Sequence, residues 1–280
     1  MPINKIKPSH GKGKLLRMRK YFIATILAFL AISTVNAQAT DTTTVAGKDS
    51  LGLAQSKNIQ AKKKNQFGNV DLSHRAGDHF MFQFGGLGWP GANGDYATKG
   101  FSREFNAAFM LDKPFKTNPH YSLGFGIGYS SSNAFFNKKN VDITAITTTL
   151  PVSTTSNVFK KYKVVLTYVE IPLELRYSAN IENPSKGFRF ALGLKGGLLL
   201  NAHSKGKNEL DATGATVKGP AYIQKEYSKR FFNTTRVDGT MRISYGLLSL
   251  FGTYQLTPLL KSGSGPVIHP YSIGLGISIM

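Results

Sequence analysis

Beyond residue 78 the chain alternates, segment after segment, between large apolar residues and small or polar ones. Between residues 121 and 129, Tyr, Leu, Phe and Ile stand at the odd positions, and Ser or Gly at the even ones. Because successive side chains of a strand point to opposite faces, this period of two predicts strands with one apolar and one polar face. Eight segments show it: residues 80–85, 101–111, 121–130, 168–177, 188–195, 237–245, 248–256 and 271–279.

The contents of the two faces distinguish between all-β architectures. A soluble sandwich or a lipocalin-like barrel also alternates, with its apolar face turned inward. Here the second face is mostly Gly, Ser and Ala with a few charges, which suits the crowded lumen of a narrow barrel. The apolar face is continuous, as a lipid-facing band should be, and only a closed sheet satisfies every backbone polar group in lipid. We therefore predict an eight-stranded antiparallel transmembrane β-barrel over residues 78–280.

The lengths of the connections support this topology. Eight strands that start from the periplasm should alternate long outer loops with short inner turns. The short connections fall at residues 112–119, 180–186 and 246–247, and the long ones at 89–100, 131–162, 202–235 and 258–266. Aromatic side chains concentrate at the two interfaces of a bilayer. We expect Trp89, Phe101 and Tyr129 at the outer interface, and at the inner one Tyr121, Tyr177, Phe188, Tyr245 and Tyr271.

The first 77 residues lack this alternation. Residues 12–20 are basic, residues 21–35 form an apolar run of 15, and small residues follow, which is the order of a secretory signal. The run is shorter than the about 20 residues of a membrane-spanning helix. We expect a signal peptide over residues 1–37, with Met18 as an alternative start. Residues 38–77 are rich in Thr, Ser, Asn, Gln and Lys, and predict a flexible periplasmic arm.

The net charge of +20, from 35 Lys and Arg against 15 Asp and Glu, invites a nucleic-acid interpretation. Seven of the basic residues and no acid lie in residues 1–37, which leaves 28 against 15, or +13, for the exported chain. We therefore expect outer-membrane lipid, and no nucleic acid, as the partner. A basic rim of outer loops either attracts lipopolysaccharide phosphates or is simply solvated. Its residues are Lys138, Lys139, Lys160, Lys161, Lys163, Lys205, Lys207, Lys218, Lys225, Lys229 and Arg230.

Charged residues also stand on the predicted lumenal face. We expect the short turn after Tyr177 to pair that residue with Phe188, and in this register Glu170 faces Lys195. Side chains just fill an eight-stranded barrel, so the charges predict a structural plug rather than an ion path or a proton relay. Pro172 has no N–H for the ladder and predicts a bulge or local irregularity. The predicted network is Glu170, Glu174, Arg176, Arg189, Lys195, Asp238 and Arg242.

Three segments resemble a known family. Residues 168–177 (YVEIPLELRY), 121–129 (YSLGFGIGY) and 271–279 (YSIGLGISI) resemble strands of the PorT-like family of small outer-membrane β-barrel proteins. The resemblance covers roughly residues 78–280 and implies the barrel fold. It also implies an accessory role in type IX secretion, although many relatives are barrels of unknown role. The chain departs from the outer-membrane pattern at Met280, where Phe often stands.

Candidate catalytic chemistry is sparse. The chain has no Cys, which removes thiol catalysis and Cys-based zinc sites, and no metal spacing stands out. We expect a non-enzymatic outer-membrane protein without a cofactor, in a structural or loop-mediated binding role, with envelope or secretion proteins as possible partners. The alternative is a lipid- or peptide-modifying barrel enzyme. It would use His and Ser near the outer rim, where Asn201, His203 and Ser204 are the nearest candidates.

Overall fold

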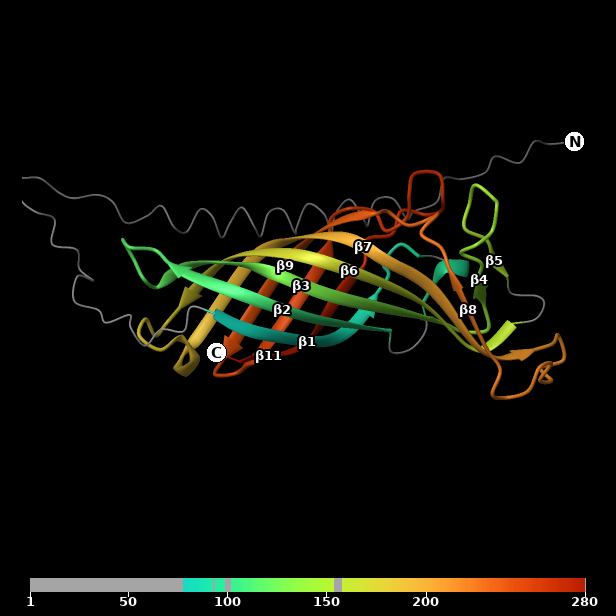
Figure 1. The fold of residues 1–280 in the computed structure, drawn as a ribbon, viewed down its shortest axis with the longest axis horizontal. Helices are drawn as coiled ribbons and strands as arrows, with labels where there is room; N and C mark the ends of the chain where they lie inside the picture. The colour runs from blue at the N-terminus through green and yellow to red at the C-terminus, as the bar shows by residue number, and fades with distance from the viewer. Residues whose placement is uncertain (1–77, 93, 99–101, 154–157, 280) are drawn as a thin grey trace, which may run out of the picture. The chain divides into compact units, whose positions relative to one another are not determined.

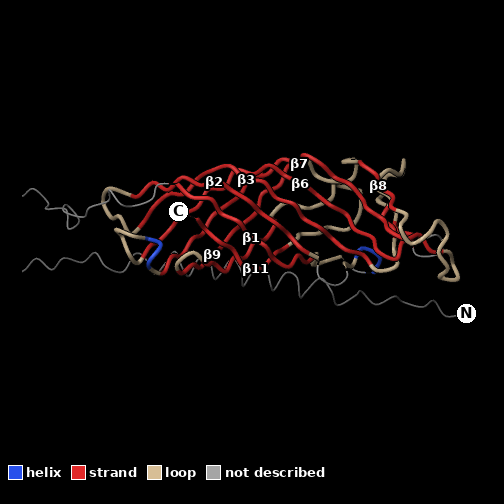
Figure 2. Tube along the Cα trace, turned by 60° about the horizontal axis from the view of Figure 1, so that its bottom comes forward, coloured by secondary structure: helices blue, strands red, loops and turns tan. Residues whose placement is uncertain are grey.

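The computed structural model describes residues 78–92, 94–98, 102–153 and 158–279, and the predicted signal peptide and periplasmic arm lie outside them. The described chain is built of strands joined by loops, with 3-10 helices η2 (Gly94–Tyr96) and η3 (Pro184–Lys186) at opposite ends (Figure 2). The strands are β1 (Asp78–Gly88), β2 (Arg103–Pro114), β3 (Tyr121–Phe136), β4 (Asn140–Val141), β5 (Val152–Ser153), β6 (Val158–Ser178), β7 (Phe188–Leu210), β8 (Ile223–Tyr227), β9 (Thr235–Tyr245), β10 (Leu248–Gln255) and β11 (Tyr271–Ile279).

Eight of these strands close into a ring (Figure 1). Neighbours follow the order β6, β3, β2, β1, β11, β10, β9, β7, and β7 returns to β6, with every pairing antiparallel. β8 extends the sheet on the other edge of β7, and β4 pairs with β5 separately. The prediction of an eight-stranded antiparallel barrel is confirmed.

The connections give the barrel two different ends. Short connections at residues 115–120, 179–187 and 246–247 define the turn end. Longer connections at residues 89–102, 137–157, 211–234 and 256–270, which contain η2, β4, β5 and β8, define the loop end. The alternation of short and long connections follows from the up-and-down topology.

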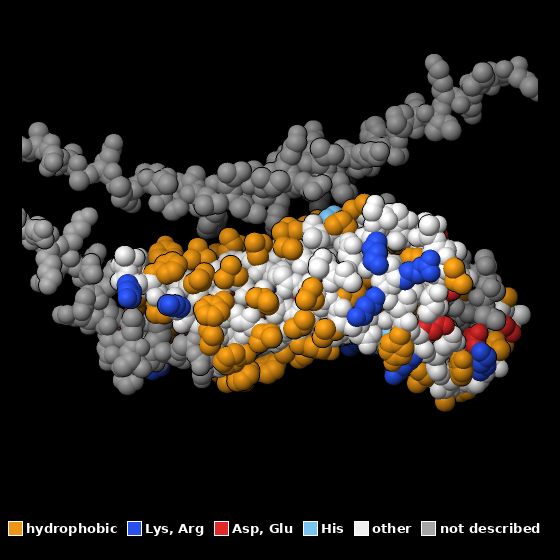
Figure 3. All heavy atoms as spheres, turned by 45° about the horizontal axis from the view of Figure 1, so that its top comes forward, with side chains coloured by type: hydrophobic (Ala, Val, Ile, Leu, Met, Phe, Trp, Pro, Cys, Tyr) orange, Lys and Arg blue, Asp and Glu red, His pale blue; other side chains and the backbone are white. Residues whose placement is uncertain are grey.

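The alternation in sequence is an alternation between lipid-facing and lumenal sides. On β11, for example, Ile273, Leu275 and Ile277 are 59%, 69% and 47% exposed, whereas the intervening Ser272 and Ser278 are buried. Figure 3 shows outward apolar side chains distributed along the barrel wall and giving way to polar and basic side chains toward the loop end. A sheet that exposes its large apolar residues and buries its serines is inverted relative to a soluble barrel.

Three strands run further than the sequence predicts. Residues 131–162 and 202–235 were expected to be outer loops, but β3 continues to Phe136, β6 already begins at Val158, and β7 continues to Leu210. These extensions pair with one another, beginning with Val158 opposite Leu210 at the loop end. They carry Lys, Ser and Asn, whereas the parts of the same strands nearer the turn end carry Leu and Ile. The strand ends were predicted from where the apolar residues stop, whereas the backbone hydrogen bonds between the strands continue beyond the apolar band.

The predicted register between β6 and β7 is wrong by two residues. Tyr177 pairs with Phe190 rather than Phe188, and Glu170 lies opposite Gly197 rather than Lys195. The hairpin closes more tightly than expected, because the N–H of Ala179 donates to the carbonyl of Phe188. One shift of register interrupts the ladder, between Thr167 and Tyr168.

The local irregularity expected at Pro172 is present: two pairs are missing from the β3–β6 ladder, at Gly126 and Ile127, whereas the pairing of Pro172 with β7 is regular. The missing pairs follow from the absent N–H of proline. Tyr271, expected at the inner interface, lies at the loop end, where it pairs with Gly88 and with Tyr254. Phe101 lies outside the described residues.

The long connections pack together into a cap over the loop end. Phe231 and Phe232 in the β7–β9 connection are buried, and Phe232 forms a bridge with Leu260 in the β10–β11 connection. Phe136 lies edge-on to Trp89 at 5.7 Å between ring centres. The cap therefore has a hydrophobic core of its own. Its buried members are Leu87, Ala92, Ala134, Phe136, Val141, Ile143, Leu150, Phe159, Tyr162, Val164, Leu166, Tyr168, Leu199, Ala202, Phe231, Phe232, Leu259, Leu260 and Ile268.

Candidate functional site

Two layers of charged side chains cross the lumen. The layer nearer the loop end, the loop-side layer, consists of Glu104, Glu170, Lys195, Arg236 and Asp238. Lys195 Nζ lies 3.2 Å from Glu170 Oε2 and 3.7 Å from Asp238 Oδ2. Arg236 donates to Glu170, lies 3.4 Å from Glu104 Oε1, and stacks 4.0 Å above the ring centre of Tyr168.

The turn-side layer consists of Asp112, Glu174, Arg176 and Arg242. Glu174 Oε2 accepts from Arg176 Nε at 2.9 Å and from Arg242 Nη2 at 2.5 Å. Arg176 Nη1 lies 3.3 Å from Asp112 Oδ1. Gly124 makes room for this layer, because a Cβ there would collide with the guanidinium of Arg176. Ionic groups in such a dry interior are retained when paired, and each carboxylate here has a cationic partner.

Of the residues predicted for the network, Arg189 stands apart from both layers. It lies at the turn end and donates to the carbonyl of Gly246 at 2.5 Å. Sequence reasoning missed Arg236, Glu104 and Asp112, all of them buried or nearly so. The signal for Arg236 was present in the sequence, since Arg236 stands two residues before Asp238 and therefore shares its face of the strand.

Outside the lumen, basic side chains form a regular array on the outward face of β6, β7 and β8. Lys163, Lys205 and Lys225 face one another in a row across the three strands. The next row toward the loop end pairs Lys161 with Lys207. We call these five residues the lysine grid. The row on the other side contains Val165, His203 and Tyr227, so no acid stands among the outward positions of the three rows.

Electrostatic repulsion is built into the lysine grid. Lysines directly opposite each other on paired strands destabilise a sheet. Burial, then the nearby Lys205, Arg103 and Lys225, lower the pKa of Lys163. Burial, then Lys163 and the other grid lysines, also lower the pKa of His203. Burial is the larger cause of both shifts, and the smaller part comes from repulsion by the neighbouring cations, which a nearby negative charge would relieve.

The barrel described so far has an outward apolar wall, a charged lumen and the lysine grid on β6, β7 and β8. The family model described as outer membrane protein beta-barrel domain matches residues 54–261 of the 280. The chain belongs to this family. It is an outer-membrane β-barrel protein, and the exposed apolar wall is its lipid-facing surface. In the described part of the chain, no helix is both long and apolar enough to cross a membrane.

Among solved structures, this outer-membrane barrel is similar to Ail, the attachment invasion locus protein of Yersinia pestis. Ail in complex with the heparin analogue sucrose octasulfate shares 9% identity over 72% of this chain and 97% of Ail, with a TM-score of 0.33. Ail in a phospholipid bilayer nanodisc shares 12% over 72% of this chain and 99% of Ail, with a TM-score of 0.28. These values describe a likeness of fold alone. No curated protein matches the chain.

The remaining basic loop residues of the outer-membrane barrel are scattered. Lys139 lies 3.3 Å from Asp95, and Arg230 Nη2 donates to the carbonyl of Ile146 at 3.1 Å. Lys138, Lys160 and Lys229 are exposed. The predicted basic rim therefore separates into the ordered lysine grid and isolated surface charges.

The residues suggested for an enzyme do not assemble. His203 faces outward and packs against Tyr227, with 5.4 Å between ring centres. Ser204, the next residue along the same strand, is buried on the opposite face. A nucleophile and its base need hydrogen-bond contact, which neighbours on opposite faces of a strand do not make. Within the described ranges, no cluster of three or more His, Asp or Glu side chains could hold a metal ion.

Proposed function

We propose that this outer-membrane barrel is a binding protein rather than an enzyme, and that its lysine grid binds phosphate groups of lipopolysaccharide in the outer leaflet. One observation carries the proposal: Lys163, Lys205 and Lys225 face one another directly across three paired strands. Such an arrangement opposes folding and gains from a polyanion that bridges the row.

The position of the grid supports a lipid partner. On β7, the outward Leu198 and Leu200 are 57% and 51% exposed and end the apolar band. Three to seven residues further along the same strand stand His203, Lys205 and Lys207. At about 3.3 Å per residue along a tilted strand, the grid lies at the depth of the lipid headgroups. A cation at this depth lies closer to the phosphate groups of the lipid than to bulk water.

This proposal fixes the orientation of the barrel. The loop end faces outward, and the turn end, where β1 begins and β11 ends, faces the periplasm. The short turns and the long connections are distributed as in other outer-membrane barrels. The PorT-like relationship is narrower than the family match, and the secretion role that it implies has no feature among the described residues in its favour.

The decisive experiment compares charge reversal at two lysines of β6 and β7. Lys205→Glu inverts the centre of the grid, whereas Lys160→Glu inverts an exposed lysine outside the grid. The full chain in neutral detergent is titrated with diphosphoryl lipid A and with chemically dephosphorylated lipid A. Reversing one grid charge should weaken binding of the diphosphoryl form by about 10- to 30-fold, the factor for a change of two charges near a lipid surface.

The control variant and the dephosphorylated lipid define what counts against the proposal. Lys160→Glu should bind diphosphoryl lipid A as the unmodified chain does, and dephosphorylated lipid A should bind all three proteins weakly. Equal affinities of Lys205→Glu and Lys160→Glu would show that the grid is not the binding surface. Equal binding of both lipids by the unmodified chain would show that phosphate is not recognised.

The same variant has an opposite effect on folding. Lys205→Glu places an acid between Lys163 and Lys225, and opposite charges across strands contribute about 0.2–1 kcal/mol each. We expect the free energy of unfolding, measured with urea in lipid-A-free vesicles, to rise in Lys205→Glu while lipid A binding falls. A variant that loses both would point to misfolding instead.

A further inference from the structure

A second group of cations lies beside the lysine grid, on the outward face of β2 and β3. Phe135 of β3 pairs with Lys163 of the grid. Lys163 Nζ lies 5.7 Å from the centre of the Phe135 ring, and the guanidinium carbon of Arg103, from β2, lies 5.1 Å from the same centre. The face of an aromatic ring attracts cations. One ring therefore positions two basic side chains, and we call Arg103, Phe135 and Lys163 the Phe135 cluster.

The position of Lys163 in this cluster is fixed further by a hydrogen bond. Its Nζ donates to Asn133 Oδ1 at 2.7 Å. Burial, followed by the proximity of Lys205 and then of Arg103, lowers the pKa of Lys163. Two like charges are thus held close together on the outward face, and an anion placed between them would relieve their repulsion.

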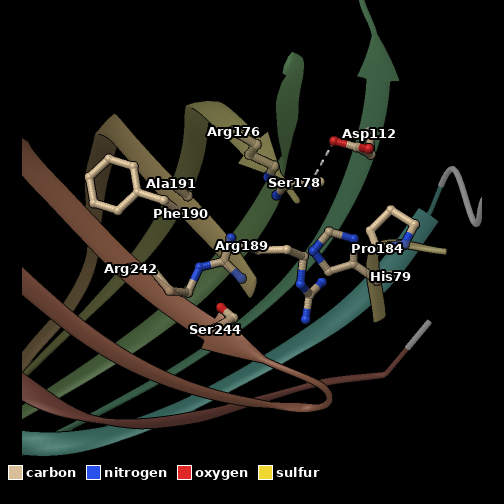
Figure 4. Close-up of a pocket in the computed structure, with 10 residues that line it drawn as sticks. All are labelled: His79, Asp112, Arg176, Ser178, Pro184, Arg189, Phe190, Ala191, Arg242 and Ser244. Atoms are coloured by element: carbon tan, nitrogen blue, oxygen red, sulfur yellow. Dashed lines mark hydrogen bonds and ion pairs between the residues drawn. The ribbon is translucent and has the colours of Figure 1, made fainter. Parts of the chain in front are cut away.

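Arg103 differs from the arginines inside the barrel. Arg176 and Arg242 line a small cavity at the turn end (Figure 4), and both pair with Glu174. Arg103 is exposed on the outward side of the sheet, and among the described residues no carboxylate lies within ion-pair distance of its guanidinium. A guanidinium in this state can bind two oxygens of one phosphate with its parallel N–H groups.

The two ends of the basic surface are separated by a definite distance. Successive strands β8, β7, β6, β3 and β2 contribute, in this order, Lys225, Lys205, Lys163, Phe135 and Arg103. Neighbouring strands lie about 4.8 Å apart, so the middle of the Lys205–Lys225 pair lies about 12 Å along the surface from the middle of the Arg103–Lys163 pair. One phosphate group is too small to contact both pairs at once.

We propose that this surface has two phosphate subsites, one at Lys205 and Lys225 and the other at Arg103 and Lys163, and that together they select a lipid whose two phosphates are separated by a disaccharide. Diphosphoryl lipid A has this chemistry, because it carries one phosphate at each end of two linked sugar rings. The inference rests on the proposed function and adds to it the number and the spacing of the phosphates that are recognised.

The test compares lipid A that carries two phosphates with lipid A that carries one. The full chain in neutral detergent is titrated with each lipid, and the unmodified chain should bind the diphosphoryl form about fivefold more tightly, the factor for one charge near a lipid surface. Arg103→Gln should remove most of this preference by weakening binding of the diphosphoryl form. Its affinity for the monophosphoryl form should not change, because a single phosphate occupies the subsite at Lys205 and Lys225, where the grid supplies more cations.

A matched variant makes the same substitution elsewhere. Arg230→Gln removes an exposed arginine of the cap and should keep the fivefold preference. Equal affinities of the unmodified chain for the two lipids would overturn the proposal. An equal loss of both lipids in Arg103→Gln would also overturn it, because it would show that Arg103 acts by general attraction rather than on the second phosphate.

The charge reversal at Lys205 separates this inference from the proposed function. If Lys205→Glu weakens binding of diphosphoryl lipid A and Arg103→Gln does not, the grid binds phosphate but the second subsite does not exist. If neither variant weakens binding, both proposals fail. Arg103 is exposed, so its substitution should not disturb folding, and gel mobility before and after heating verifies that the variant barrel is closed.

Discussion

Arg236 connects more groups than any other side chain described in the lumen. Its guanidinium reaches Glu170, Glu104, Asp238 and the hydroxyl of Ser130, to which it donates at 2.7 Å. Gly197 on β7 leaves space for its stem, since a Cβ there would approach Arg236 Cγ to 3.0 Å. The arginine neutralises several carboxylates at once, so its removal leaves buried charge without compensation.

Replacing this arginine should destabilise the barrel severely. We expect Arg236→Leu to lower the free energy of unfolding by about 3–5 kcal/mol, because Glu170 loses its closest cation. Urea unfolding from lipid vesicles measures the difference. The double variant Arg236→Leu with Glu170→Leu should lose clearly less than the sum of the two single variants. Strict additivity would mean that the two residues act independently, contrary to the geometry.

At the scale of elements, the sequence predicts which face each residue occupies better than how far each strand extends. The alternation alone assigns Glu170, Glu174 and Lys195 to the lumen, because each side chain of a strand points either to the lipid or to the lumen. It does not determine register, since a shift of two residues preserves every face, and the β6–β7 pairing differs by that amount.

The partners across the lumen do not follow from the sequence for a related reason. Glu170 and Lys195, which were predicted to face each other, lie 3.2 Å apart as diagonal neighbours on paired strands. Arg242 of β9 contacts Glu174 of β6, and β7 lies between these strands. Contacts across the lumen depend on the tilt and stagger of the closed sheet, which no local pattern encodes.

The cap over the loop end was likewise not foreseen, and it is an element whose strength can be measured. Phe232→Ala removes a buried ring that joins two connections, and we expect a loss of about 3–5 kcal/mol confined to the cap. Trypsin should then cleave near Lys225 and Lys229 about 100-fold faster, the factor for about 3 kcal/mol of local opening. Gel mobility before and after heating reports whether the barrel itself stays closed.

Ile146→Ala provides the comparison for this experiment. Ile146 lies on a connection of the same cap but is 89% exposed, so its truncation should leave trypsin cleavage unchanged. If Phe232→Ala is as resistant as Ile146→Ala, the buried cluster does not hold the cap together. If it unfolds the whole barrel, cap and barrel form one cooperative unit.

For the whole molecule, two independent charge layers block one lumen. The loop-side layer and the turn-side layer draw on different residues, and Phe251 adds a buried ring on the lumenal side of β10. An eight-stranded barrel has little interior space beyond its side chains. We expect the lumen to be closed to ions, so that the protein acts through its outer surface and not as a pore.

Conductance measurements in planar bilayers check this expectation. The unmodified chain should give no steps comparable to those of a porin. Glu174→Ala with Arg242→Ala, which removes an ion pair from the turn-side layer, should still not conduct, since the loop-side layer is intact. Adding Glu170→Ala and Arg236→Ala should produce discrete openings. Conduction by the unmodified chain or by the first double variant would refute the two-layer plug.

The seam of the barrel has a consequence for biogenesis. β1 pairs with β11, so that Phe80 meets Ile279 almost 200 positions further along the chain. The ladder that closes the barrel therefore joins the first and the last strand of the described residues, and such distant partners make closure slow. A chain that ends before β11 leaves one edge of β1 without a partner strand. A prematurely terminated polypeptide that lacks β11 therefore cannot close the barrel, because β1 has no strand to pair with.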